Sequence, residues 1–476
     1  MRDKYDNPLI TRYASEDMAY LFSDDHKFKT WRKLWIALAE AEMELGLDIR
    51  PEQIEEMRKY ACDINYKVAD EREKQVRHDV MAHIHAFGQQ ARSAAGIIHL
   101  GATSCFVGDN ADLIIMDKAI DIVIRRLVNV MDKLASFCMK YRNLPTLGFT
   151  HFQPAQLTTV GKRASLWLQE LEMDYHELRH LKDIFKLRGV KGTTGTQDSF
   201  LALFDGDAEK VNELEKKVAS KMGYRQSYRV TGQTYPRKFD SMVLNALSLV
   251  AQSAAKFAND LRLLQSMKEL EEPFEAHQIG SSAMAYKRNP MRSERIAALA
   301  RYVISLQSSP ANTASVQWLE RTLDDSANKR LVIPQAFLAV DSILNIYANI
   351  AEKIVVYENM IKKHIAMELP FMATERILME AVKKGGDRQE MHERIRMHSM
   401  QAAERVKMEG MDNDLLDRIK NDDNFQLTPE EIDRLVSAEN FIGFSAYQVE
   451  SYIQSDIQKI LSENSDILGD KGEVRV

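Results

Sequence analysis

The residue types best suited to chemistry gather between Gly280 and Pro290, a stretch that reads GSSAMAYKRNP. Glycine and serine favour a mobile loop, and the adjacent Lys287 and Arg288 would attract an anion. A hydroxyl on a loop that closes over bound carboxylates could take a proton from a substrate. The stretch therefore predicts a base on a mobile loop.

A second candidate is His151, in the segment Thr150-His151-Phe152-Gln153-Pro154. The segment follows a loop with Pro145 and Gly148 and precedes a long helical pattern, so we expect His151 at a helix entrance. Histidine titrates near neutrality and can give or take a proton. The alternative is a surface or capping histidine.

Arg77-His78-Asp79 precedes another helical pattern. We expect Asp79 to cap that helix, and Arg77 and His78 to bind an anion at its N-terminus. The alternative is a solvated helix end. A metal site is disfavoured, because His78 and His85 share a helix face that His83 does not.

Further polar residues lie in turns that precede long helical patterns. Thr103 and Ser104 could hold a carboxylate together with backbone N–H groups, and Gln233 could bind a carboxylate or an amide. The alternative is turn formation and helix capping. Arg321, Ser326 and Arg330 could clamp a phosphate, or the arginines could pair with nearby acids.

Composition restricts the class of protein that carries these residues. The chain has 476 residues, 45% hydrophobic and 28% charged, which indicates a globular, soluble protein of two or three domains. A net charge of −6 disfavours broad nucleic-acid binding. No apolar run predicts a membrane span and the start does not resemble a secretory signal. Three separated cysteines indicate free thiols, so we expect a cytoplasmic protein.

Helical periodicity dominates the chain. Apolar residues recur at steps of three and four over residues 110–141, 156–187, 239–270 and 324–360. Pro334 should begin or kink the last of these helices. Helices of ~45 Å imply an elongated all-α bundle, whose apolar faces should associate between subunits. We expect domains at residues 1–103, 104–360 and 361–476, with the loop 280–290 in the central bundle.

Taken together, these motifs resemble the adenylosuccinate lyase family, within the fumarase/aspartase superfamily. The superfamily's signature, read as GSSxMPxKxNP, matches the stretch 280–290 except that Ala285 replaces a proline, which should loosen the loop. The resemblance extends from Thr11 to Arg330. It implies an all-α, three-domain lyase built around a tetrameric helix core. Each active site would combine segments from three subunits and need no cofactor or metal.

The resemblance also implies a reaction and residue roles. The family eliminates fumarate from adenylosuccinate, giving AMP, and from a succinyl-carboxamide ribotide in purine synthesis. Ser281 would be the base, rather than its neighbour Ser282, and His151 the acid, oriented by Glu294. His78 would lie near the phosphate or assist the acid. The substrate carboxylate would bind Lys287 and Asn289. The succinyl part would contact Thr103, Ser104 and Gln233, and the nucleotide or its phosphate would contact Arg12, Tyr13, Arg295, Arg321, Ser326 and Arg330. Arg77 and Asp79 complete the predicted substrate-binding set.

Three other functions compete with this one. The nearest is a sister lyase for argininosuccinate, aspartate or fumarate, which should carry fewer phosphate-binding arginines. A structural protein descended from a lyase, as in the lens crystallins, is disfavoured by the presence of both His151 and Ser281. A nucleic-acid binder should show a basic stripe, which is not seen. An assay of fumarate release from each substrate separates the two lyases.

Overall fold

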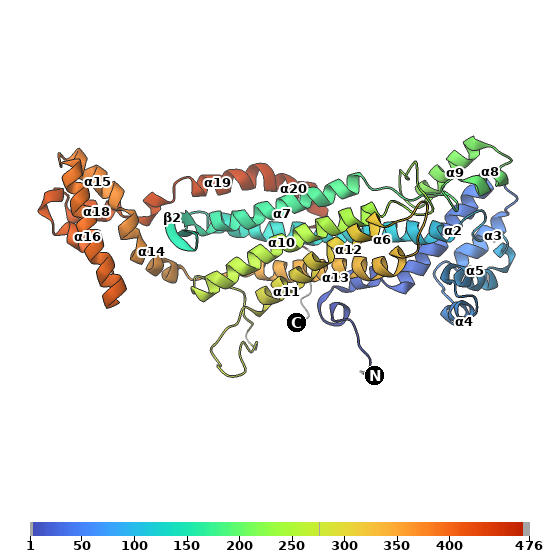
Figure 1. The fold of residues 1–476 in the computed structure, drawn as a ribbon, viewed down its shortest axis with the longest axis horizontal. Coiled ribbons are helices and arrows are strands. Elements are labelled where there is room, and N and C mark those ends of the chain that lie inside the picture. The colour runs from blue at the N-terminus through green and yellow to red at the C-terminus, as the bar shows by residue number, and fades with distance from the viewer. Residues whose placement is uncertain (1–2, 276, 470–476) are drawn as a thin grey trace.

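The computed structural model describes residues 3–275 and 277–469. The chain forms a long rod in which helices α6, α7, α10, α11 and α13 run along the middle (Figure 1). The described residues are mostly helical, with two short two-stranded sheets. The expectation of an elongated all-α bundle is confirmed. The domain boundaries at residues 103 and 360 stay predictions.

The N-terminal part covers one end of the rod with short helices around a core that includes Trp31, Trp35 and Phe87. Its elements are η1 (Leu9–Tyr13), α1 (Glu16–Leu21), α2 (Asp24–Glu44), α3 (Pro51–Lys59), α4 (Tyr66–Val76), α5 (Asp79–Gln90) and η2 (Arg92–Ala94).

The central part forms the bundle. Its elements are α6 (Ser104–Lys140), β1 (Pro145–Thr150), β2 (Gln153–Thr159), α7 (Val160–Asp183), α8 (Asp198–Leu203), α9 (Ala208–Lys221), α10 (Lys238–Ser266), β3 (Leu270–Glu271), α11 (Met291–Leu306), α12 (Ser308–Ser315), α13 (Asp325–Glu352) and β4 (Val355–Val356). Helix α6 packs against α7 and α13, and α10 packs against α7, α11 and α13. Apolar residues at helical spacing fill the space between them, as the periodicity predicted.

The predicted helix over residues 156–187 is wrong at its beginning. Residues 153–159 form strand β2, which pairs antiparallel with β1 from Pro145↔Thr159 to Thr150↔Gln153. His151 and Phe152 form the two-residue turn with φ of 53° and 56°, the left-handed values that a tight hairpin requires. His151 therefore lies at the tip of a hairpin, and not at a helix entrance. Threonines at 158 and 159 favour the strand, and helix α7 begins one residue later.

Pro334 lies inside α13, which begins at Asp325, so of the two expectations for this proline the beginning of the helix is wrong, and a kink stays a prediction. The helix is long and apolar enough to cross a membrane by composition, but 83% of its most apolar window is buried inside the protein. That burial is typical of a core helix.

The C-terminal part begins with a small bundle that has its own apolar core, from Ala373 to Ile432, and then returns along α7 (Figure 1). Thr428 caps α18 as expected, and Tyr452 anchors the returning segment through a 2.7 Å hydrogen bond to Glu172. Its elements are α14 (Glu358–Met372), α15 (Thr374–Lys383), α16 (Arg388–Glu409), α17 (Leu415–Lys420), η3 (Asp423–Phe425), α18 (Pro429–Leu435), η4 (Ala438–Phe441), α19 (Ser445–Tyr452), η5 (Ile453–Ile457), α20 (Gln458–Glu463) and η6 (Ser465–Ile467).

Candidate active site

One cavity brings together many of the residues predicted from the sequence. Its volume is about 710 Å³, within the range of small-molecule sites. It is formed where α4 ends and where α5, α6 and α13 begin, with Gln233 reaching it from the loop before α10. The predicted residues that line it are Arg77, His78, Asp79, Ser104, Gln233, Arg321, Ser326 and Arg330.

His78 connects two of the helices that form this cavity. Its Nδ1 accepts a hydrogen bond from the backbone N–H of Met81 at 3.3 Å, so His78 is the N-cap of α5. The expectation that Asp79 caps this helix is wrong, because Asp79 occupies the first helical position. Since Nδ1 acts as an acceptor, the neutral ring carries its proton on Nε2, which lies 3.2 Å from Ser104 Oγ. Thr103 is the N-cap residue of α6. Within the described residues, its side chain makes no hydrogen bond to the first turn of that helix.

The two arginines of the predicted phosphate clamp are both paired with carboxylates. Arg321 Nη1 lies 3.1 and 3.0 Å from the two oxygens of Asp325, and Arg330 Nη2 lies 3.2 Å from Asp79 Oδ2. Ion pairing was the stated alternative to phosphate binding. The two roles are compatible, because a guanidinium has five donors and these pairs use only some of them. The pairs hold the arginines at the cavity wall.

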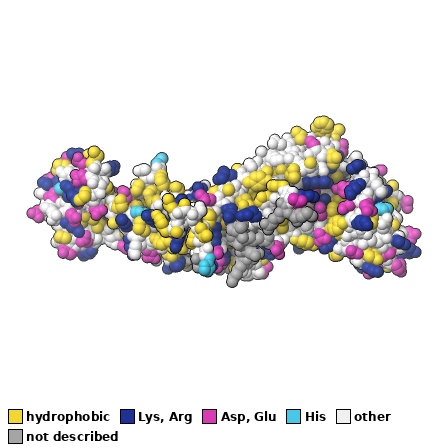
Figure 2. All heavy atoms as spheres, turned by 90° about the horizontal axis from the view of Figure 1, so that it is seen from below, with side chains coloured by type: hydrophobic (Ala, Val, Ile, Leu, Met, Phe, Trp, Pro, Cys, Tyr) yellow, Lys and Arg dark blue, Asp and Glu magenta, His cyan; other side chains and the backbone are white. Residues whose placement is uncertain are grey.

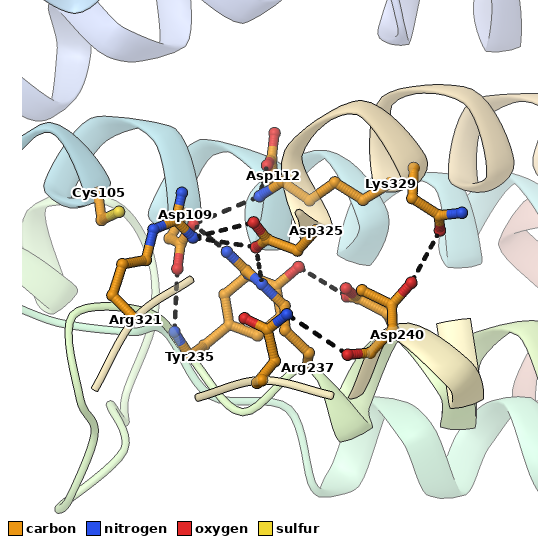
Figure 3. A network of polar contacts seen from close by, with 12 residues as sticks. Cys105, Asp109, Asp112, Tyr235, Arg237, Asp240, Arg321, Asp325 and Lys329 are labelled. Carbon is orange, nitrogen blue, oxygen red and sulfur yellow. Dashed lines mark hydrogen bonds and ion pairs between the residues drawn. The ribbon is translucent and has the colours of Figure 1, made fainter. Parts of the chain in front are cut away.

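A buried charge network forms part of the cavity wall: Asp109, Asp112 and Lys329 line the cavity, and Arg237 and Asp325 contact them or Arg321 from beneath the surface (Figure 3). Arg237, only 1% exposed, lies 2.9 Å from Asp109 and 2.5 Å from Asp325. Lys329 lies 3.4 Å from Asp109 and 2.7 Å from Asp112. Burial alone would raise the pKa of Asp109, but Arg237 and Lys329 lower it to about 2. The network therefore stays ionised and fixes the start of α13 against α6.

These network residues were missed by the sequence reasoning. Asp109 and Asp112 interrupt the apolar face of α6, where a charge without a partner would be costly, and that interruption was the available signal. Arg237 lies four residues after Gln233, just before α10, and Asp325 directly precedes Ser326. Nothing in their spacing indicated that they meet.

Ser281 and the other residues of the signature loop lie outside this cavity. Ser281 Oγ accepts hydrogen bonds from the backbone N–H groups of Ala283 and Met284 at 3.4 and 3.2 Å. Donors of this kind favour the ionised form of an oxygen, which suits a hydroxyl that must act as a base. Lys287, Asn289 and Glu294 line a separate hollow of about 600 Å³ beside the end of α10.

The loop is closed at its neck by backbone contacts. Asn289 Nδ2 donates to the carbonyl oxygen of Gly280 at 2.7 Å. A Cβ atom on Gly280 would lie 2.3 Å from the carbonyl oxygen of Lys287, so no larger residue fits without moving the loop. Asn289, predicted to bind substrate, thus also fastens the loop in this structure.

His151 is exposed at the hairpin tip and far from the first cavity. The cavity contains Ser104, at the start of α6, whereas the hairpin follows the end of the same helix. Helix α6 has 37 residues, and at 1.5 Å per residue it is ~55 Å long. Figure 1 shows the hairpin and α5 near opposite ends of the central helices. One subunit therefore cannot bring His151 to its own His78.

The remaining predicted residues form a small cluster of their own. The guanidinium groups of Arg12 and Arg295 lie 5.9 and 5.6 Å from the centre of the Tyr13 ring. Tyr13 ends η1, and Arg295 lies in the first turns of α11, next to Glu294. Cations beside an aromatic face could hold an anionic nucleotide.

Comparisons with known proteins show the family to which the chain belongs. The model of a lyase family matches residues 15–305, and the model described as the adenylosuccinate lyase C-terminus matches residues 370–452. The adenylosuccinate lyases of Saccharomyces cerevisiae and Schizosaccharomyces pombe are 54% and 53% identical over 472 and 461 residues, which is 98% and 96% of both chains. That of Schistosoma mansoni is 46% identical over 98% of both chains.

Solved structures share the fold at low sequence identity. A 3-carboxy-cis,cis-muconate lactonizing enzyme from Pseudomonas putida has a TM-score of 0.82 at 21% identity, covering 95% of this chain and all of its own. A fumarate lyase from Mesorhizobium sp. BNC1 has a TM-score of 0.78 at 19% identity, with the same coverage. At such low sequence identity, these two structures support the fold and say nothing about the substrate. On the sequence matches, the chain belongs to the adenylosuccinate lyase family.

Proposed function

We propose that the protein splits adenylosuccinate into AMP and fumarate, and splits the succinyl-carboxamide ribotide of purine synthesis in the same way. The family assignment supports this substrate class. The cavity supports it as well, since it presents arginines for a phosphate and amide and hydroxyl groups for a succinyl chain. The protein would act in the cytoplasm and without a cofactor.

The reaction requires a base, an acid and a cation near the substrate carboxylate. Ser281 Oγ would remove the proton from the carbon next to the C–N bond, and His151 would protonate the nitrogen that leaves. The electron pair of the C–H bond forms the double bond of fumarate, while that of the C–N bond stays on nitrogen. Lys287 and Asn289 would stabilise the charge that develops on the carboxylate, and Glu294 would orient His151.

The observation that carries this proposal is the separation of the predicted residues within one chain. The cavity lies at the start of α6, and the hairpin with His151 lies beyond the end of α6. Ser281 lies on a loop that does not line the cavity and is not part of the hairpin. If all of these groups act on one substrate, they must come from different chains. We therefore propose a homotetramer in which three subunits contribute to each site.

The surface of the central bundle is suited to such an assembly. Leu166 and Met173 on α7 are 50% and 67% exposed, and Leu249 and Leu263 on α10 are 41% and 46% exposed. Figure 2 shows hydrophobic side chains gathered over the middle of the rod, seen from below. Helices that expose apolar residues in a row commonly pack against a second copy.

Fumarate release tests the proposed function. The purified protein should release fumarate from adenylosuccinate, and from the ribotide, at rates far above those with argininosuccinate, aspartate or malate. Absorbance of fumarate follows each reaction directly. Faster turnover of argininosuccinate than of either purine compound would reject the proposal.

A further inference from the structure

Three carboxylates follow one another in the short segment Glu269–Glu272, between the end of α10 and the signature loop. Glu269 is 0% exposed and Glu272 is 3% exposed. Burying a carboxylate is costly unless it has specific partners, so each should serve a contact. Most of their partners lie on the helices next to the hairpin and the signature loop, the two structures that carry the proposed acid and base.

Glu269 faces the hairpin. Its Oε1 lies 2.7 Å from His364 Nδ1 on α14, and its Oε2 lies 3.9 Å from Arg163 Nη1 on α7. Arg163 in turn donates from Nη2 to the carbonyl oxygen of Leu147, in strand β1. Its guanidinium also lies 5.9 Å from the Phe149 ring centre. Glu269 Oε2 and Arg163 Nη1 have no hydrogen-bond partner among the described residues, so Glu269 acts on this arginine, which holds the strand leading to His151, through its charge alone.

Glu272 faces the signature loop. Its carboxylate accepts from the backbone N–H groups of Arg292 and Ser293 at 3.0 and 2.9 Å, and from Ser293 Oγ at 2.9 Å. These residues begin α11, directly after the loop. Glu271 adds a 3.4 Å ion pair with Arg288, inside the loop itself.

The segment is itself held in place by a short sheet. Leu270 and Glu271 form β3, which pairs with β4, and Tyr357 donates from its backbone N–H to Glu269 O at 2.9 Å. Tyr357 also donates from its hydroxyl to Glu271 Oε2 at 2.7 Å. The backbone that carries these carboxylates is therefore held in place by β4 and Tyr357.

We propose that Glu269, Glu271 and Glu272 are positioning residues that hold the hairpin of His151 and the neck of the Ser281 loop from one common segment. The assignment of a reaction to these two groups rests on the proposed function, but the anchoring does not. In a site shared between subunits, a displaced hairpin or loop would misplace an acid or a base while leaving the nucleotide cavity intact. Turnover should then fall, and for the hairpin, which carries no substrate-binding residue named above, substrate affinity should persist.

Two substitutions test the contacts towards the hairpin (the hairpin arm) and the contacts towards the signature loop (the loop arm) separately. Glu269→Gln removes the charge that faces Arg163, and Glu272→Gln removes the charge that holds the start of α11. We expect Glu269→Gln to speed backbone hydrogen exchange in peptides that cover residues 145–159, and Glu272→Gln to speed it in peptides that cover residues 280–290. Each should lower kcat by ~10- to 100-fold, because a misplacement of about 1 Å costs on that order. For Glu269→Gln, KM should change less than about threefold, since the hairpin carries none of the substrate-binding residues named above. Glu272→Gln should raise KM as well, because the loop carries Lys287 and Asn289.

The C-terminal part offers a matched control. Asp422 also binds a histidine and an arginine, with His398 Nε2 at 3.0 Å and Arg394 Nη1 at 3.3 Å, but its partners lie on α16. Asp422→Asn makes the same chemical change and should leave kcat and exchange in both peptides unaltered. His364→Leu provides a milder test of the hairpin arm if Glu269→Gln does not assemble, and it should speed exchange over residues 145–159 only.

Unchanged exchange in both peptides, or exchange raised evenly along the chain, would overturn the proposal. Equal effects from Asp422→Asn would overturn it too. The exchange readout separates this inference from the proposed function. A wild-type protein without lyase activity would reject the proposed function, whereas the two peptides would still report whether the carboxylates anchor their targets.

Discussion

The buried charge network in the cavity wall leads to a quantitative prediction for Asp325. Its side chain is 0% exposed and binds both Arg237 Nε at 2.5 Å and Arg321 Nη1 at 3.0 Å. The substitution Asp325→Asn keeps the size of the side chain but removes its charge. Arg237, itself 1% exposed, would then lose one of its two carboxylate partners.

Breaking a buried ion pair costs ~3–5 kcal/mol, and Arg237 keeps Asp109, so we take the lower limit of about 3 kcal/mol. For a large domain each kcal/mol lowers Tm by ~2 °C, which gives a fall of about 6 °C for Asp325→Asn. Arg321 would also lose its partner at the cavity wall. KM for the nucleotide should rise about tenfold, equivalent to ~1.4 kcal/mol, with kcat largely kept.

Calorimetry at pH 7.5 and initial rates of fumarate release measure the two effects. The control is Asp433→Asn, an aspartate that is 60% exposed and pairs with Lys420 at 2.5 Å. Exposed pairs contribute less than ~1 kcal/mol, so this variant should lose less than about 2 °C. Equal Tm values for the two variants, with an unchanged KM, would refute the idea that the network supports the cavity.

Other predictions concern stability and the loop. Burial raises the pKa of Glu42 to about 9, and its carboxyl oxygens have no hydrogen-bond partner among the described residues. Its folded pKa is the higher one, so its contribution to stability is complete below the usual pKa of about 4.5 and is lost as pH rises towards 9. Glu42→Gln should therefore raise Tm at pH 8 and leave it unchanged at pH 4; equal Tm shifts at both pH values would contradict this. Gly280→Ala should lower kcat at least tenfold, because its Cβ would lie 2.3 Å from a backbone oxygen, while Tm stays within about 2 °C; normal turnover would show that the loop neck is not needed. Arg330→Gln should raise KM more than it lowers kcat, and the reverse in steady-state rates would remove Arg330 from substrate binding.

Much of the fold followed from local pattern. Apolar residues at steps of three and four predicted the long helices, because one stripe of each must be buried. The hairpin was missed because Gln153–Thr159 is short, and its pairing with Pro145–Thr150 depends on a turn with two left-handed residues. His151 is such a residue, and left-handed backbone in a histidine is not visible in a sequence pattern.

For the candidate site, too, local pattern predicted some residues but not the contacts between distant ones. Turns before long helices predicted His78, Ser104 and Gln233 as binding residues, and the structure places all three at one cavity together with Arg330 of α13. Helix N-termini that meet at one place leave donors for an anion, but the binding roles themselves stay predictions. The partners of these residues could not be predicted. Asp109 meets Lys329 across 220 positions of sequence, and only packing of α6 against α13 brings them together.

Mixing two inactive variants tests the account most directly. His151→Ala and Ser281→Ala proteins, each inactive alone, are mixed in equal amounts, dissociated and reassembled, and exchange of subunits is verified by mass spectrometry. If each site takes its acid and its base from different chains, about a quarter of the sites regain both groups, and activity should return to about that fraction of the wild type. Reassembled hybrids that remain inactive would contradict the claim that this imidazole and this hydroxyl meet across a subunit boundary.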